Sequence, residues 1–166
     1  MSAPSTSANL QFRGVAHPPP KRGGRECAAD LNAAEIGTTN LGRRGGTPLL
    51  VEHDHGARAG RVLASWEGRH GELRVAGIVD DAAAAQTVRS GEMRGLSLGT
   101  GVTMDADGNA LMRTQDELSL CAEPRRAGCY IDTLDGRPVR TVAAFSKAGT
   151  LASPLLPPPA KQHVGG

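Results

Sequence analysis

Aromatic side chains are scarce in this sequence of 166 residues, which contains one Trp, one Tyr and two Phe. Hydrophobic residues still make up 39% of the chain, which is enough to form a core of Leu, Val, Ile and Ala within one domain of ordinary size. The 22 Gly and 11 Pro indicate many turns. Together these features favour a small, mainly β fold over a helical bundle.

Other features in short supply exclude several classes of protein. A formal net charge of +2 is too small to indicate nucleic acid as the main partner. Residues 1–11 lack the apolar core of a signal peptide, and no apolar run is long enough to span a membrane. Cys27, Cys121 and Cys129 cannot all pair within one chain. We therefore expect free thiols in a reducing compartment and a protein that is not secreted.

The sequence divides into one domain with two loose ends. Residues 1–8 are small and polar and are predicted to be disordered. The domain is predicted to span residues 9–145, and residues 146–166 read as a flexible, Pro-rich tail. Helices are predicted over residues 26–36, ending at Gly37, and over residues 80–90, ending at Gly91.

Short strands are predicted before, between and after these helices. Apolar and polar residues roughly alternate over 10–15, and short strand-like runs with turn residues between them cover 48–53, 60–66, 72–79 and 117–121. The sequence DADG at 105–108 is a turn signal between strand-like residues, so it predicts a hairpin.

Three segments of the sequence carry residues that together could catalyse hydrolysis. An apolar strand ends at His53, Ser97 lies between two leucines and two glycines, and Glu117 begins another strand. A hydrolytic serine needs a base to take its proton and a third group to orient that base. Ser97, His53 and Glu117 supply one of each. In this interpretation Gly95 and Gly99 leave room for a substrate backbone.

The order of the segments resembles a known family. PLLVEH at 48–53, GRV at 60–62, GLSLG at 95–99 and ELSL at 117–120 look like the prohead proteases of tailed phages and the related herpesvirus assemblins. The resemblance covers about residues 47–131. Assemblins carry a second histidine where this chain has Glu117, whereas prohead proteases are similar to this chain in having an acidic residue there.

The segment CAEPRR at 121–126 looks more like the assemblins, whose arginine pair helps to bind the oxyanion. If the arginine pair of this chain has the same roles, the backbone N–H of Arg125 would donate to the oxyanion, and the Arg126 side chain would hold a water there. The alternative is a solvated surface pair of arginines.

The resemblance implies a small closed or nearly closed antiparallel β-barrel with one to three flanking helices. It also implies a serine endopeptidase of procapsid maturation, working through an acyl-enzyme with a Ser-His-Glu triad and without a cofactor. Its substrate would be the internal scaffolding protein, and also its own precursor. The expected location is the assembling procapsid inside the host cell, and the expected assembly is a homodimer. Ala152-Ser153 resembles an assemblin cleavage site, but an ordinary linker is the favoured explanation, because Pro154 directly after it restricts an extended fit in a cleft.

Three other interpretations of the same residues stay open. His53, His55, Cys121 and Cys129 suggest a metal site, but their spacing matches no tight zinc pattern, which favours buried thiols. Asp54 or Asp116 is an alternative to Glu117 as the orienting acid. The third is a catalytically silent β-barrel that binds capsid or scaffold.

Overall fold

A computed structural model describes residues 9–21 and 27–139. Three sequence predictions lie outside the described residues: the disordered segment 1–8, the Pro-rich tail 146–166 and the candidate cleavage site Ala152-Ser153. The last six residues of the predicted domain, 140–145, also lie outside them.

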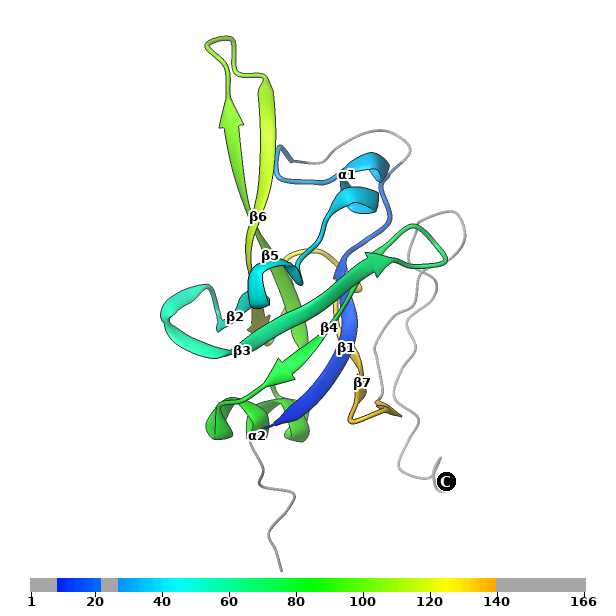
Figure 1. The fold of residues 1–166 in the computed structure, drawn as a ribbon, viewed down its shortest axis with the longest axis vertical. Helices are drawn as coiled ribbons and strands as arrows, with labels where there is room; N and C mark the ends of the chain where they lie inside the picture. Colours follow the sequence, from blue (N-terminus) through cyan, green and yellow to red (C-terminus); the bar gives the residue numbers. More distant parts are fainter. Residues whose placement is uncertain (1–8, 22–26, 140–166) are drawn as a thin grey trace, which may run out of the picture.

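The described chain is mainly β, with two α-helices and one short 3-10 helix (Figure 1). In chain order the elements are β1 (Leu10–His17), α1 (Ala33–Thr38), η2 (Arg43–Gly45), β2 (Thr47–Val51), β3 (Asp54–Glu67), β4 (Leu73–Val79), α2 (Ala82–Ser90), β5 (Gly95–Met104), β6 (Ala110–Cys121), β7 (Ile131–Leu134) and β8 (Arg137–Pro138). Among these elements, neither α-helix has the length and apolar content to span a bilayer.

All eight strands belong to one sheet, in the order β5-β6-β2-β3-β4-β1-β7-β8. The pairs are antiparallel except β2 and β6, which run parallel. Strand β6 therefore lies beside β5 on one side and β2 on the other, which brings the three sequence segments with candidate chemistry onto neighbouring strands.

The prediction of a barrel is only partly right, because the sheet is not closed by a continuous ladder. An isolated bridge joins Gly95 of β5 to Tyr130, and the Val15 N–H of β1 donates to the Tyr130 carbonyl at 3.1 Å. The residue before β7 thus touches both β5 and β1. The sheet curls until these strands approach one another, while most of the outer edge of β5 lacks a strand partner in the described chain.

The core is built from aliphatic residues, as the composition predicts. Strand β4 alternates buried and half-buried positions along its whole length, which is the pattern of a strand with one face on the core. Phe12 is the one aromatic side chain among the buried core residues of the described chain. Leu49, Leu118 and Leu120 are fully buried, so the two parallel strands beneath the candidate site are firmly anchored.

Of the two predicted helices, one is confirmed and one is largely wrong. Helix α2 has Asp81 as its N-cap and ends at Gly91, whose φ of 90° is the left-handed cap that glycine favours. Helix α1 begins at Ala33 instead of residue 26, because Asn32 forms a capping box with Glu35. Gly37 consequently lies inside α1 and does not end it.

The predicted hairpin is confirmed and is longer than expected. Strands β5 and β6 are joined by the turn at 105–108, where the Asp105 carboxylate accepts the N–H groups of Asp107 and Asn109. In Figure 1 the hairpin extends away from the rest of the sheet, with α1 beside it and α2 at the opposite end of the molecule.

Candidate active site

His53 lies in a tight turn, and not at a strand end as the sequence predicts. Strand β2 stops at Val51, and Glu52 and His53 connect it to β3 with φ values of 49° and 60°. Two successive residues with positive φ define the tight hairpin turn in which Asn-Gly is usual. For Glu and His this backbone costs on the order of 1 kcal/mol each, and such strain is concentrated at functional sites.

Two hydrogen bonds that the turn donates to β6 hold it in place. The Glu52 N–H donates to the Leu120 carbonyl at 2.9 Å, and the His53 N–H donates to Ser119 Oγ at 2.9 Å. The turn therefore continues the parallel pairing of β2 and β6 beyond the end of β2. The His53 side chain is 46% exposed, so it remains open to an incoming molecule.

Ser97 lies on β5, directly opposite Ser119 of β6. Leu96 and Leu98 on either side of it are buried, which fixes the strand in the core as the sequence predicts. Ser97 is not open to solvent, because only 7% of the residue is exposed. Its hydroxyl instead faces His53, and Oγ lies 2.9 Å from Nε2.

Glu117 completes a chain of three side chains. Its Oε2 lies 2.6 Å from His53 Nδ1, and its side chain is only 8% exposed. A carboxylate has no proton to donate, so Nδ1 must carry the ring hydrogen, and in the neutral imidazole Nε2 is left with a lone pair. That lone pair faces the Ser97 hydroxyl. The arrangement can remove the Ser97 proton and stabilise the resulting imidazolium.

The two glycines near Ser97 have a different role from the predicted one. At Gly99 the space for a β-carbon is taken by the Glu117 carboxylate, and at Gly95 it is taken by the Cys121 carbonyl and Pro124. The missing side chains therefore admit groups of this chain itself. Gly99 lets Glu117 reach His53, and Gly95 lets the chain after β6 cross closely over β5.

The segment 122–129 arches over the end of β5 close to Ser97. Gly95 pairs with Cys121 on one side and bridges to Tyr130 on the other, so both ends of the segment are fixed two residues before Ser97. The Leu96 N–H also donates to the Cys129 carbonyl at 2.8 Å. The predicted oxyanion residues Arg125 and Arg126 both belong to this arch.

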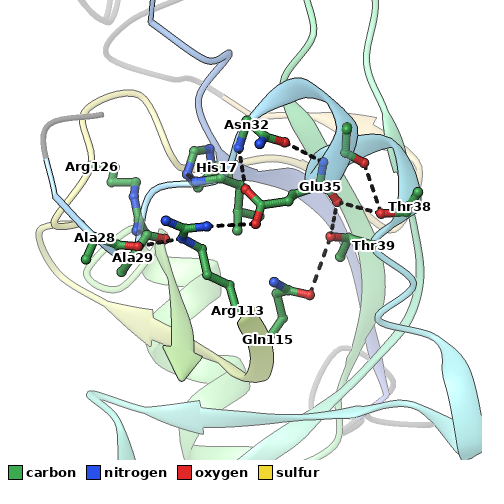
Figure 2. A network of polar contacts seen from close by, with 12 residues as sticks. His17, Ala28, Ala29, Asn32, Glu35, Thr38, Thr39, Arg113, Gln115 and Arg126 are labelled. Carbon is green, nitrogen blue, oxygen red and sulfur yellow. Dashed lines mark hydrogen bonds and ion pairs between the residues drawn. The ribbon is translucent and has the colours of Figure 1, made fainter. Parts of the chain in front are cut away.

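Arg126 points into a polar network that sequence reasoning missed (Figure 2). Its Nε donates to Asp30 Oδ1 at 3.0 Å and its Nη2 to the Ala29 carbonyl at 3.2 Å, and its side chain is 12% exposed. The guanidinium thus ties the arch to the segment before α1. Arg125 is exposed.

The other acids proposed for the site have different positions. Glu117 is the acid that contacts His53, whereas Asp54 Oδ1 accepts the Gly56 N–H at 2.8 Å and the Asp116 carboxylate lies beside Gly101. Ser119 is the residue that the sequence analysis overlooked. Strand alternation was the available signal, because it places Ser119 on the same face as Glu117.

The metal-site alternative gains nothing from the described residues, which contain no group of three or more His, Cys, Asp or Glu placed to hold an ion. All three cysteines are free, and Cys121 and Cys129 are buried. Burial raises the pKa of Cys121 to about 11 and that of Cys129 to about 12, so both thiols stay protonated near neutral pH.

Comparison with known proteins places the fold among herpesvirus proteases. No family model matches the sequence, and no curated protein matches it. Among solved structures, a Kaposi's sarcoma-associated herpesvirus protease with a hexapeptide phosphonate inhibitor aligns with a TM-score of 0.55 and 16% identity, over 74% of this chain and 63% of that chain. The varicella-zoster virus protease aligns with a TM-score of 0.51 and 16% identity, over 75% and 63%.

A third structure extends the alignment over more of the chain. The Kaposi's sarcoma-associated herpesvirus protease in complex with a dimer disruptor aligns with a TM-score of 0.52 and 15% identity, over 92% of this chain and 99% of that chain. At these identities the similarity is one of fold. The assemblin side of the resemblance in the sequence is therefore matched by the architecture.

Proposed function

We propose that this protein is a serine endopeptidase with Ser97 as nucleophile, His53 as general base and Glu117 as the group that orients and charge-balances His53. The observation that carries the proposal is the unbroken chain of contacts from Ser97 Oγ to His53 Nε2 at 2.9 Å and from His53 Nδ1 to Glu117 Oε2 at 2.6 Å. Both are hydrogen-bond distances, short enough for a proton to pass between the two atoms. The fold that the chain shares with herpesvirus proteases supports it.

The reaction follows from these positions. Ser97 Oγ attacks the carbonyl carbon of the scissile peptide while its proton passes to His53 Nε2, which gives a tetrahedral oxyanion and an imidazolium beside Glu117. The imidazolium then protonates the leaving amine as the C–N bond breaks, and an acyl-Ser97 ester remains. Water, deprotonated by His53, attacks the ester, releases the acid and restores Ser97.

The arch over β5 is the proposed oxyanion site. In this proposal the backbone N–H of Arg125 donates to the oxyanion, and Arg126 holds a water there or holds the arch itself. The contacts of Arg126 with Asp30 and Ala29 favour the second role, since they already direct its guanidinium toward the segment before α1. Preorganised donors of this kind contribute strongly because they do not reorganise during the reaction.

The proposed substrate is the internal scaffolding protein of a procapsid, together with the enzyme's own precursor. This step rests on the resemblance to prohead proteases and assemblins and on the shared fold. It implies action inside the host cell, within the assembling procapsid. A homodimer is proposed on the same basis, since a dimer disruptor binds the aligned Kaposi's sarcoma-associated herpesvirus protease.

Co-expression with the scaffolding protein of the same virus or provirus tests the proposal. We expect the scaffold to be cleaved by the wild-type chain and to remain intact with Ser97→Ala, which keeps the fold. Ser65→Ala is a matched control, because it removes a hydroxyl that bonds to Leu41 and Thr39. A scaffold that stays intact with all three proteins, while binding each of them, would favour the silent capsid-binding barrel.

A further inference from the structure

Ser119 occupies a position that is costly for a hydroxyl unless it is fully bonded. It lies on β6 opposite Ser97, and none of its surface is exposed. A buried hydroxyl without partners destabilises a protein, so such groups are normally paired. The partners of this one are both members of the candidate active site.

The hydroxyl of Ser119 joins the main chain of His53 to the side chain of Glu117. Its Oγ accepts the His53 N–H at 2.9 Å and donates to Glu117 Oε1 at 2.9 Å. A serine hydroxyl carries one proton and two lone pairs. The backbone N–H must use a lone pair and the carboxylate must receive the proton, so the donor and acceptor roles are fixed.

This assignment agrees with the ring hydrogen on His53 Nδ1 that the Glu117 carboxylate requires. Ser119 Oγ also lies 3.4 Å from His53 Nδ1, but its single proton is already directed at Glu117 Oε1. Nδ1 therefore receives no proton from Ser119 and must donate its own to Glu117 Oε2. The Nε2 lone pair is left facing Ser97, which is the tautomer that the reaction needs.

We propose that Ser119 is a positioning residue of the active site, which fixes the reactive tautomer of His53 through Glu117 and fixes the His53 turn through its main chain. This inference rests on the proposed function. Glu117 has both oxygens engaged, Oε2 by His53 and Oε1 by Ser119, so its carboxylate cannot rotate without breaking one of the two bonds. A single hydroxyl thus restrains both ends of the His53–Glu117 pair.

The test combines ¹⁵N NMR of the histidine ring with the rate at which a fluorophosphonate probe labels Ser97. In the wild-type protein, at a pH where His53 is neutral, we expect the Nδ1–H tautomer. In Ser119→Ala we expect a mixture that includes the Nε2–H tautomer and labelling that is about ten- to a hundredfold slower. Ser119→Thr, which keeps the hydroxyl, is expected to restore the Nδ1–H tautomer and most of the rate.

Two results would overturn the inference, and the labelling of wild-type Ser97 separates both of them from a failure of the proposed function. One is a wild-type spectrum dominated by the Nε2–H tautomer, which needs no variant and therefore stands even if Ser119→Ala does not fold. The other is a folded Ser119→Ala protein with wild-type labelling and an unchanged tautomer. Ser65→Ala, which loses a hydroxyl bonded to two backbone groups far from His53 and Glu117, is the control for a general loss of stability. If wild-type Ser97 is never labelled, the proposed function fails instead.

Discussion

Gly99 and Glu117 face one another across the β5–β6 ladder, and the Glu117 carboxylate fills the space that a side chain at Gly99 would need. This relationship explains how a carboxylate on one strand reaches a histidine in the turn after β2. It also gives Gly99 a requirement that has nothing to do with backbone flexibility, since its φ is not in the left-handed region.

Gly99→Ala is therefore expected to displace Glu117 from His53 and to slow the labelling of Ser97 about a hundredfold, because small misplacements of catalytic groups have costs of this size. Gly37→Ala is the matched control. Its added methyl group meets only the end of the Glu67 side chain, at 3.4 Å, and Ala is favoured over Gly inside a helix. Equal labelling rates for the two variants would contradict the proposed role of Gly99.

Glu117→Gln should leave the fold intact and lower kcat by about 10⁴, as expected when the orienting acid becomes an amide that favours the wrong tautomer of the base. The measurement is kcat for a cleaved peptide, with thermal unfolding as the check on folding. Glu92→Gln, at an exposed position before β5, is the control and should behave as the wild type. A fall of only a fewfold would mean that another group orients His53.

The two proposed roles of Arg126 can be separated by a double-mutant cycle with Asp30. If Arg126 acts by tying the arch to Asp30, then Arg126→Gln and Asp30→Asn should each lower kcat by up to about a hundredfold, and the double variant should be no worse. If Arg126 holds a water independently, Asp30→Asn alone should retain activity. Arg43→Gln, in the exposed 3-10 turn, controls for the loss of one positive charge.

Stability should fall in mild acid because of His17. Its Nδ1–H donates to the Pro18 carbonyl at 2.7 Å and its Nε2 accepts the Leu31 N–H at 3.0 Å, an arrangement that requires the neutral ring. Burial lowers the pKa of His17 to about 4, against 6.5 in the unfolded chain. Between these values the unfolded state binds the proton and the folded state does not, so stability is lost as pH falls from 6.5 toward 4.

Between pH 7 and pH 5 the loss from His17 alone should amount to about 2 kcal/mol in the free energy of unfolding. Denaturant titrations at the two pH values measure it. His17→Gln is expected to be less stable at pH 7, because it disturbs the network in Figure 2, but to lose less stability on acidification. The same pH dependence in both proteins would show that other groups cause it.

Local sequence patterns predicted the elements that depend on local signals. Helix α2 has an acidic N-cap and a glycine C-cap, and the β5–β6 turn has an Asp-x-Asp-Gly signal, so both could be located. The residues of the candidate triad were also chosen from the sequence, and the structure brings the three into contact. That choice depended on the order of the segments, since each residue alone carries little information.

Features that depend on distant contacts could not be predicted in this way. The Glu52-His53 turn has none of the usual turn residues, and it is held by Leu120 and Ser119 from a strand far along the chain. The capping box at Asn32 competes with a helix start at residue 26, and propensity alone did not decide between them. Whether a sheet closes into a barrel depends on how its two edge strands meet in space, and the pattern of residues along the sequence does not contain that information.

The most direct test of the central claim is to treat the purified protein with a fluorophosphonate probe and to locate the adduct by mass spectrometry. The proposed mechanism predicts one adduct, on Ser97, that disappears in Ser97→Ala and becomes much weaker in His53→Ala. A wild-type protein that shows no adduct, or an adduct that persists in Ser97→Ala, would contradict the assignment of Ser97 as the nucleophile.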